Sequence, residues 1–518
     1  MRKKGGGQNE GNQEGFQRRQ SVVSAFLLLA AGHGDDAQFG RIIAFCLGKM
    51  DAAGEHPSRR HPKFEEIMQL SSYNIIVDNY PTQGEHLVYN TRTQALVKIN
   101  QELRDILDAP FSPTNLSANT RYANELSQLS QMGILVESKA QDVEELKEFF
   151  KALKYDLKDP SFYVTVLTTS ACNFKCKYCF EESSRDNFSM DLSTCDAALR
   201  WIKKKLLDEK HKQLTLTFYG GEPFLNEQAM EYLALNLGAW CAIRRIGFKF
   251  LIQTNGYLLT AERVERYKNL GLSEVRVSLD GVGNEHDANR PLRGGGGTFD
   301  TIIRNIVENA DRIKIGLSVS YDEKGVGHIE RLLNYLEGLN ALRKLGKFIC
   351  SPIHASLGPA TRPENIHNSA CMANLHDENL LKATMDIDAL MEKKGLPISR
   401  GLPVSSCSLG RKHGGVTIDP HGRLYACNAM VGHPDLSIGH VHDEGLSERH
   451  KDFLEMNVGL TCSLDCPYLP ICNGGCRFMS FLENKKFDAP SCKKRYLDIA
   501  APELIKREYE ASLREEAA

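Results

Sequence analysis

Two hydrophobic periods alternate along the central part of this chain. Short apolar runs with the character of buried strands recur at 162–168, 214–218, 248–253, 274–279, 314–320 and 348–352. Stretches with a helical period lie between them, for example at 194–207 and 298–310. This alternation predicts six βα units, a parallel sheet and an α/β fold in the form of a partial (β/α)6 barrel. In such folds the loops at the carboxyl ends of the strands carry the chemistry.

The N-terminal part has a different pattern, with short strands followed by two amphipathic helices. Strand-like runs lie at 73–77, 87–89, 95–99 and 134–136, a turn at 82–84, and helical stretches at 101–107 and 121–132. Strands and two or three helices in so short a segment predict a small winged-helix-like module. A helical stretch at 143–153 leads out of it.

The residue composition changes again after Pro397, where short segments rich in Gly, Pro and Cys begin. Such segments cannot build a large core, so a module held together by metal is expected. We predict six parts: a disordered or over-long N-terminus at 1–70, the winged-helix-like module at 71–137, a helical linker at 138–158, the α/β core at 159–395, the Cys-rich domain at 396–500 and a helical tail at 501–518. Met50 and Met68 are alternative starts.

Charge and hydropathy narrow the classes of partner. Lys and Arg total 64 and Asp and Glu 66, so no basic field for nucleic acid is expected. No apolar run approaches the roughly 20 residues of a membrane-spanning helix. Arg18 and Arg19 before the apolar run 22–31 are similar to an export signal, but their surroundings fit one poorly and no small-x-small cleavage site follows. We therefore predict a cytoplasmic protein.

The cysteines are clustered rather than spread. Cys172, Cys176 and Cys179 stand together directly after the first strand of the α/β core. Thiolates are the usual ligands of iron–sulfur clusters, and three of them would leave one iron of a four-iron cluster open to a small molecule. A zinc site completed by a distant residue is the alternative. Five other cysteines are interpreted as small buried residues or idle thiols: Cys46, Cys195, Cys241, Cys350 and Cys371.

Four motifs follow the first four predicted strands of the core. They are Cys-x3-Cys-x2-Cys after the first strand, Gly-Gly-Glu-Pro after the second, Gln-Thr-Asn-Gly after the third and Ser-Leu-Asp-Gly after the fourth. With these motifs in this order, the segment 162–352 resembles the radical S-adenosylmethionine (SAM) superfamily. The resemblance implies a cluster on Cys172, Cys176 and Cys179. It also implies SAM-binding residues, namely Tyr178, Gly220, Gly221, Glu222, Pro223, Asn255, Ser278, Asp280 and Arg290. Tyr178 would line the adenine and Arg290 would pair with the SAM carboxylate. Gly294–Gly297 is interpreted as a flexible loop.

The cysteines of the last quarter closely resemble a SPASM domain, which carries auxiliary four-iron clusters. By resemblance, Cys462, Cys466, Cys472 and Cys492 would hold one cluster, and Cys407, Cys427 and Cys476 the other. The second set needs a further ligand or leaves one iron open, for example to a substrate thiolate. The spacing Cys462-x3-Cys466 departs from the usual x2. Structural zinc is the alternative for this domain.

The resemblance implies a cluster that passes one electron to SAM, and a 5′-deoxyadenosyl radical that abstracts hydrogen from a substrate. SPASM enzymes include peptide maturases and anaerobic sulfatase maturases. The segment 73–136 resembles the leader-binding module of peptide maturases, which takes the leader as an added strand. Sulfatase maturases carry an aspartate where this chain has Asn428, which cannot act as a carboxylate base.

We therefore expect an oxidoreductase-type peptide maturase that forms a thioether or carbon–carbon crosslink. Its expected partners are a precursor peptide with a leader and an electron donor of flavodoxin or ferredoxin type. Formylglycine formation in a sulfatase is the second hypothesis. A non-catalytic iron–sulfur protein for electron transfer is the third. No catalytic side chain is assigned.

Overall fold

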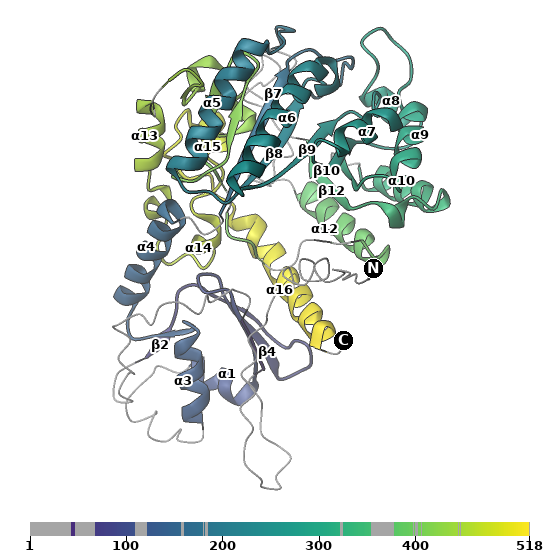
Figure 1. The fold of residues 1–518 in the computed structure, drawn as a ribbon. Coiled ribbons are helices and arrows are strands. Elements are labelled where there is room, and N and C mark those ends of the chain that lie inside the picture. The colour runs from purple at the N-terminus through teal and green to yellow at the C-terminus, as the bar shows by residue number, and fades with distance from the viewer. Residues whose placement is uncertain are drawn as a thin grey trace, which may run out of the picture. The chain divides into compact units, whose positions relative to one another are not determined.

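The structure is a computed structural model of the chain (Figure 1). It describes residues 43–46, 68–108, 122–156, 160–179, 181, 185–321, 325–353, 378–396, 398, 402–405, 407–443, 445 and 447–516. Arg18, Arg19, Met50 and Cys371 lie outside them. The chain divides into two compact units, which are described separately. The first comprises 1–145, 465–467 and 502–518, and the second comprises 146–464 and 468–501.

The first unit contains the small N-terminal sheet that the sequence predicts. Its strands are antiparallel and ordered β1 (Ile43–Cys46), β5 (Ala95–Asn100), β4 (Glu85–Asn90) and β3 (Asn74–Val77). A second, two-stranded sheet pairs β2 (Gln69–Leu70) with β6 (Leu135–Val136). The helices α1 (Gln101–Asp108) and α3 (Ala123–Gln131) bury Leu103 and Leu126 in one core with Val97 of β5.

The second unit is built on one long sheet. Its order is β12 (Lys347–Pro352), β11 (Ile315–Tyr321), β10 (Leu272–Ser278), β9 (Gly247–Thr254), β8 (Gln213–Gly220), β7 (Ser161–Thr169), β13 (Val416–Ile418), β14 (Arg423–Tyr425) and β15 (Gly439–His440). Strands β7 to β12 are all parallel to their neighbours. The predicted α/β class is confirmed, and each of the six predicted strands is present within a few residues.

Helices connect successive parallel strands of this sheet. They are α5 (Leu192–Asp208), α6 (Glu227–Arg244), α7 (Ala261–Lys268), α8 (Asn284–Asn289), α9 (Phe299–Asn309) and α10 (Val326–Gly338). Figure 1 shows α5 and α6 lying along β7 and β8. Side-chain caps begin several of these helices. Asp191 accepts a hydrogen bond from the Thr194 amide at the start of α5, and Thr260 accepts one from Arg263 at the start of α7.

The Cys-rich segment shares the core of this unit. Strand β13 is parallel to β7, with Val416 opposite Val164, and β14 and β15 continue the sheet as antiparallel strands. Ile418 and Tyr425 are fully buried in the same cluster as the parallel strands. The sequence predicts a module held together by metal. In the structure the sheet supplies part of the apolar support, because β13 borders β7 directly.

Further helices complete the second unit or belong to both. They are α12 (Glu378–Lys393), α13 (Glu448–Glu455), α14 (Leu469–Cys472), α15 (Arg477–Asn484), α4 (Lys139–Tyr155) and α16 (Lys494–Glu516). No helix in the described part of the chain is both long and apolar enough to cross a membrane.

Candidate radical-generating site

The first cysteine cluster lies at the carboxyl end of the parallel sheet. Strand β7 ends at Thr169, and the loop that follows carries Cys172, Cys176 and Cys179. The segment 289–293 holds this loop by its backbone. The amides of Lys175 and Lys177 donate to the carbonyls of Pro291 and Asn289 at 2.9 and 3.0 Å, and the amide of Arg293 donates to Asn173 O at 2.8 Å. These hydrogen bonds fix the backbone of the cysteine loop against the segment 289–293.

The environment of the three thiols suits a cationic cluster. All three are partly buried. Burial raises the pKa of Cys172 to about 12, and burial also raises the pKa of Cys176, against the opposing charge of Arg290. Such thiols stay neutral on their own, and a bound metal would favour their deprotonation. Three convergent sulfur donors on one ordered loop fit a four-iron cluster with one open iron.

Two glycines allow β8 to end against the base of this loop. A Cβ atom on Gly220 would lie 2.3 Å from the carbonyl oxygen of Thr169, and one on Gly221 would lie 2.2 Å from that of Ala171. Both distances are far below van der Waals contact. The amides of Gly221 and Glu222 in turn donate to those two carbonyls. Glycine is therefore required here for backbone packing, and the contacts of Gly220 and Gly221 with SAM stay predictions.

Glu222 ties together the ends of β8 and β9. Its fully buried carboxylate accepts hydrogen bonds from Thr254 Oγ1 at 2.8 Å, from the Asn255 amide at 2.9 Å and from the Phe224 amide at 3.2 Å. Burial raises the pKa of Glu222 to about 7, although these bonds oppose the shift. Pro223 starts the short helix that follows and is buried. In the described residues Glu222 therefore acts as a positioning residue.

Asn255 joins this network to the cysteine loop. Its Nδ2 donates to Asn173 Oδ1 at 2.7 Å, within the sequence Cys172-Asn173-Phe174. The ends of β8, β9 and the cysteine loop are thus connected through Glu222 and Asn255. A change at either residue would shift the cysteines without touching them.

Asp280 and Arg290 form a largely buried ion pair beside the cysteine loop. Arg290 Nε donates to Asp280 Oδ2, while Asp280 Oδ1 accepts from the Ser320 amide at 2.8 Å. The guanidinium lies 5.3 Å from the centre of the Tyr178 ring, and its Nη1 is 3.8 Å from Cys176 Sγ. Arg290 is thus not a surface charge. Ser278 ends β10 beside these residues.

Tyr178 has an unused polar atom. Its hydroxyl is buried and finds no hydrogen-bond partner among the described residues. A buried hydroxyl without a partner indicates a site built to receive a further group. The predicted SAM-binding residues thus gather around the cysteine loop, at the ends of β8, β9 and β10. Their individual contacts with SAM stay predictions.

Sequence reasoning missed three residues beside the loop. Tyr219 interacts electrostatically with Glu181, Cys179 and Arg290. Burial raises the pKa of Glu181 to about 7, with Arg185 opposing the shift, and Arg185 Nη2 lies 3.4 Å from Cys179 Sγ. Tyr219 could have been found from the alternation of β8, because it follows the buried Phe218 and so faces the opposite side of the sheet. No sequence signal marks Glu181 or Arg185.

A cavity adjoins this loop. It has a volume of about 270 Å³ and is lined by residues that flank the cysteine loop and by residues of the Cys-rich segment: Leu167, Ser170, Glu181, Arg185, Asp186, Asp419, Pro420, His421, Arg423, Val431, Gly432 and Pro434. His421 pairs with Asp186 at 2.6 Å and stacks on Phe188. The polar and charged lining suits a ligand with hydrogen-bonding groups.

Three C-terminal cysteines come together from distant positions in the sequence. Cys407 and Cys427 interact electrostatically with each other and with Cys476. Burial raises the pKa of Cys427 to about 12 and also raises that of Cys407. These buried sulfur donors fit the predicted second auxiliary cluster by the same argument as the first loop.

Arg477 interacts with cysteines of both predicted auxiliary sets and was not expected. It interacts with Cys407 and Cys476 of one set and with Cys462 and Cys472 of the other. Its guanidinium is buried and donates to four backbone carbonyls, those of Gly474, Gly475, Phe487 and Ala489. A buried cation between two groups of thiolates would offset their negative charge.

The remaining cysteines divide as follows. Cys466 belongs to the first unit, whereas Cys462, Cys472 and Cys492 belong to the second, so that this ligand set stays a prediction. Cys195 and Cys241 are fully buried in the apolar core, and Cys350 packs against Met391. Asn428 accepts a hydrogen bond from Thr417 Oγ1, next to Cys427.

Comparison with known proteins identifies the core. The model of the radical SAM superfamily matches residues 166–336. Residues 166–336 form a radical SAM domain. This domain makes the chain an enzyme, and it implies SAM and one four-iron cluster as cofactors.

Relatives extend the similarity beyond the radical SAM domain. The chain is 31% identical over 183 residues to the Fe-coproporphyrin III synthase of Methanosarcina barkeri, but spans only 42% of that protein's length. It is 24% identical over 332 residues to the cysteine-type anaerobic sulfatase-maturating enzyme of Clostridium novyi, covering 60% of this chain and 86% of the relative. The solved structure of anSMEcpe with bound AdoMet has the same fold, with a TM-score of 0.50, 20% identity, and coverage of 68% of this chain and all of that one.

Proposed function

We propose that this enzyme cleaves SAM reductively and uses the resulting 5′-deoxyadenosyl radical to modify a peptide, forming a thioether or carbon–carbon crosslink. The observation that carries the proposal is the ordered Cys172-to-Cys179 loop at the carboxyl end of a parallel sheet, beside a polar cavity. When bound, the cluster supplies the electron that breaks the sulfur–carbon bond of SAM.

The chain's own residues bind and orient SAM in this proposal. Asp280 holds Arg290 at Nε, and Arg290 Nη1 lies beside Cys176 Sγ, so that the guanidinium stands next to the cysteine loop, where it can pair with a carboxylate. Tyr178 offers a ring face and a buried hydroxyl to the adenine end. Glu222 and Asn255 keep the loop in place, and the buried surroundings exclude water from a reactive radical.

Two observations support a peptide as the substrate class. The relative from Clostridium novyi, matched over most of its length, is by name a maturase of a sulfatase, which is a protein substrate. The cavity beside the cysteine loop is lined by charged and hydrogen-bonding groups and is contiguous with the Cys-rich segment that would hold auxiliary clusters.

Anaerobic sulfatase maturation is the second candidate, and the same relative favours it. Asn428 argues against it, because an amide cannot accept a proton as a carboxylate does. Asn428 is also engaged by Thr417. An Asn428→Asp variant would sharpen the distinction: formylglycine produced by the variant but not by the wild type would favour an altered sulfatase maturase.

The N-terminal sheet is the proposed leader-binding site. Within the described residues, β3 forms one edge of this sheet, and β1 covers the outer edge of β5. A leader that adds as a strand can therefore pair with β3 directly or with β5 after β1 leaves. Deleting residues 1–67 is expected to tighten leader binding several-fold in the second case and to leave it unchanged in the first. Fluorescence anisotropy of a labelled leader distinguishes the two cases.

The central experiment measures both 5′-deoxyadenosine and the modified peptide. The anaerobically reconstituted protein, with dithionite, SAM and a co-encoded precursor peptide, should release 5′-deoxyadenosine and shift the peptide mass by the loss of two hydrogens per crosslink. SAM cleavage without any change in peptide or sulfatase substrates would contradict the substrate class and leave the radical chemistry standing. Absence of SAM cleavage in protein with a full iron content would contradict the proposed function and favour a non-catalytic electron carrier.

A further inference from the structure

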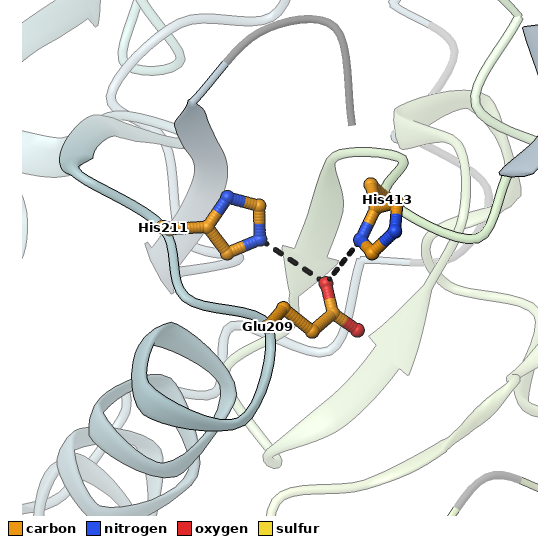
Figure 2. A group of neighbouring side chains, drawn as sticks. All are labelled: Glu209, His211 and His413. Atoms are coloured by element: carbon orange, nitrogen blue, oxygen red, sulfur yellow. Dashed lines mark hydrogen bonds and ion pairs between the residues drawn. The ribbon is translucent and has the colours of Figure 1, made fainter. Parts of the chain in front are cut away.

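A group of two histidines and a glutamate lies apart from all the cysteines discussed above. Glu209 and His211 occupy the turn between α5 and β8, and His413 lies shortly before β13, 204 residues after Glu209. Figure 2 shows both imidazoles directed at one carboxylate. Tertiary structure alone brings these three residues together.

The three side chains share one atom. Glu209 Oε2 lies 3.1 Å from His211 Nε2 and 2.9 Å from His413 Nδ1. The donor atoms of all three lie within 4.8 Å of one another. The side chains of His211, Glu209 and His413 are 0%, 13% and 14% exposed, so the group is shielded from water.

The donor set is that of a transition-metal site. Two imidazole nitrogens and one carboxylate oxygen are preferred ligands of zinc, which takes three or four of them in a tetrahedral arrangement. Lys205 Nζ and both imidazoles lie against the Glu209 carboxylate, so an anionic oxygen donor stands at the centre of the group. A metal ion would replace the protons that the two imidazoles share with Oε2.

A third histidine stands near the group. His450, on α13, interacts electrostatically with Lys205 and Glu209. Both of its ring nitrogens are buried, and neither has a hydrogen-bond partner in the described part of the chain. A buried imidazole without partners is costly, and a metal offers it one. Lys205 bonds to the other oxygen of Glu209, Oε1, which leaves Oε2 to the imidazoles.

The position of the group separates it from the radical chemistry. His211 stacks on Phe162 at the start of β7, with ring centres 5.1 Å apart, whereas the cysteine loop follows the end of that strand at Thr169. The group therefore lies at the amino ends of the parallel strands, where residues serve stability rather than catalysis. It links the α5–β8 turn to the segment that enters β13, which pairs with β7.

We propose that Glu209, His211 and His413 bind one divalent transition-metal ion of the zinc class, with His450 as the candidate fourth ligand. The ion braces β13 against the radical SAM domain. This site is separate from the iron–sulfur clusters and does not depend on the proposed reaction.

Metal analysis and X-ray absorption test the site in the fully iron-loaded protein. Growth with zinc should yield about one zinc ion per chain that survives desalting. The zinc edge should show only nitrogen and oxygen neighbours at about 2.0–2.1 Å, whereas zinc misplaced in a cysteine site would show sulfur at about 2.3 Å. Absence of zinc, or zinc with sulfur neighbours alone, would overturn the proposal and leave a hydrogen-bonded His–Glu–His bridge.

Variants locate the ion. His413→Ala and Glu209→Gln should each reduce zinc by at least about fivefold while iron content stays at the wild-type value, which reports that the chain still folds. The half-exposed His328 on α10 lies outside the group, so His328→Ala should retain zinc. Lys205→Gln removes the competing positive charge and should bind zinc at least as tightly as wild type. Zinc retained by both His413→Ala and Glu209→Gln would assign the ion elsewhere and refute the site.

Discussion

The two cysteine-rich regions of this protein are built in opposite ways. Cys172, Cys176 and Cys179 come from one loop of eight residues, and backbone hydrogen bonds from 289–293 already hold that loop. Cys407, Cys427 and Cys476 come from three separate segments, and the buried Arg477 interacts with Cys407 and Cys476 of this set. Bringing together ligands from one short loop costs little conformational entropy. Bringing together ligands from distant segments costs more, because long loops must be closed. We therefore expect metal to matter for function in the first region and for folding as well in the second.

The largest expected effect separates the two regions completely. Cys176→Ala removes one of three local ligands and should abolish 5′-deoxyadenosine formation, while the C-terminal clusters stay and about eight irons are retained. Product analysis and iron determination measure both. Cys350→Ala, a thiol that contacts Met391 outside the loop, should keep SAM cleavage. SAM cleavage by Cys176→Ala would refute the assignment of this loop.

A variant in the C-terminal cysteine set is expected to affect both peptide modification and protein stability. Cys427→Ala should lose roughly four irons and peptide modification, yet retain SAM cleavage without peptide. Its melting temperature should fall, because Cys427 closes loops of the distributed set, whereas Cys176→Ala should melt close to wild type. Differential scanning fluorimetry under anaerobic conditions compares the two. Equal melting temperatures would contradict the proposed contrast between local and distributed ligand sets.

Backbone packing under the local loop predicts a smaller, graded effect. Gly221→Ala places a Cβ atom 2.2 Å from Ala171 O, so the cysteine loop must shift. We expect SAM cleavage to fall about tenfold or more and stability by about 2 kcal/mol. Gly294→Ala is the matched control, because a Cβ atom there meets nothing within 4 Å. If Gly221→Ala and Gly294→Ala behave alike in the cleavage assay, the tight approach has no functional role.

The last expected effect concerns the pH dependence of stability. Burial raises the pKa of Glu222 from 4.5 to about 7. The folded state thus holds this proton more tightly than the unfolded chain does, and the stability it contributes is present below about pH 4.5 and lost as pH rises through about 7. Between those values the loss is at most about 3 kcal/mol.

Glu222→Gln is neutral at every pH and should flatten this part of the stability profile. Thermal denaturation of wild type and variant from pH 5 to pH 8 measures the difference. Arg263 is the charged group that interacts with Glu222 and opposes the shift, so the same profile in Arg263→Gln serves as a check. Parallel profiles for wild type and Glu222→Gln would mean that Glu222 is ionised throughout.

Much of the fold could be predicted from the sequence because the local pattern of apolar and polar residues determines where the strands and helices form. The runs at 162–168 and 214–218 became β7 and β8 with small extensions, and 194–207 became α5. The cysteine loop was predictable for the same reason: its ligands are neighbours in sequence, and their position after a strand determines which end of the sheet they occupy.

Other features depend on contacts between distant segments, and no local pattern encodes those. The pairing of β13 with β7, the place of Arg477 among four cysteines and the cavity lined by Glu181 and His421 all belong to this group. Tyr219 was predictable only in part. The alternation of buried and exposed residues in β8 predicts which face of the sheet its side chain occupies, but not which residues surround it.

By itself, then, the sequence determined the α/β class, the order of elements and the radical SAM loop, because each rests on residues close together in the chain. The tertiary structure alone decided that Glu209, His211 and His413 meet, and that the glycines after β8 serve backbone packing. The physical reason is the same in both cases. Close approach between segments about 50 or 200 residues apart depends on how the strands pair and pack. The local sequence around one residue does not predict which distant residue it will contact.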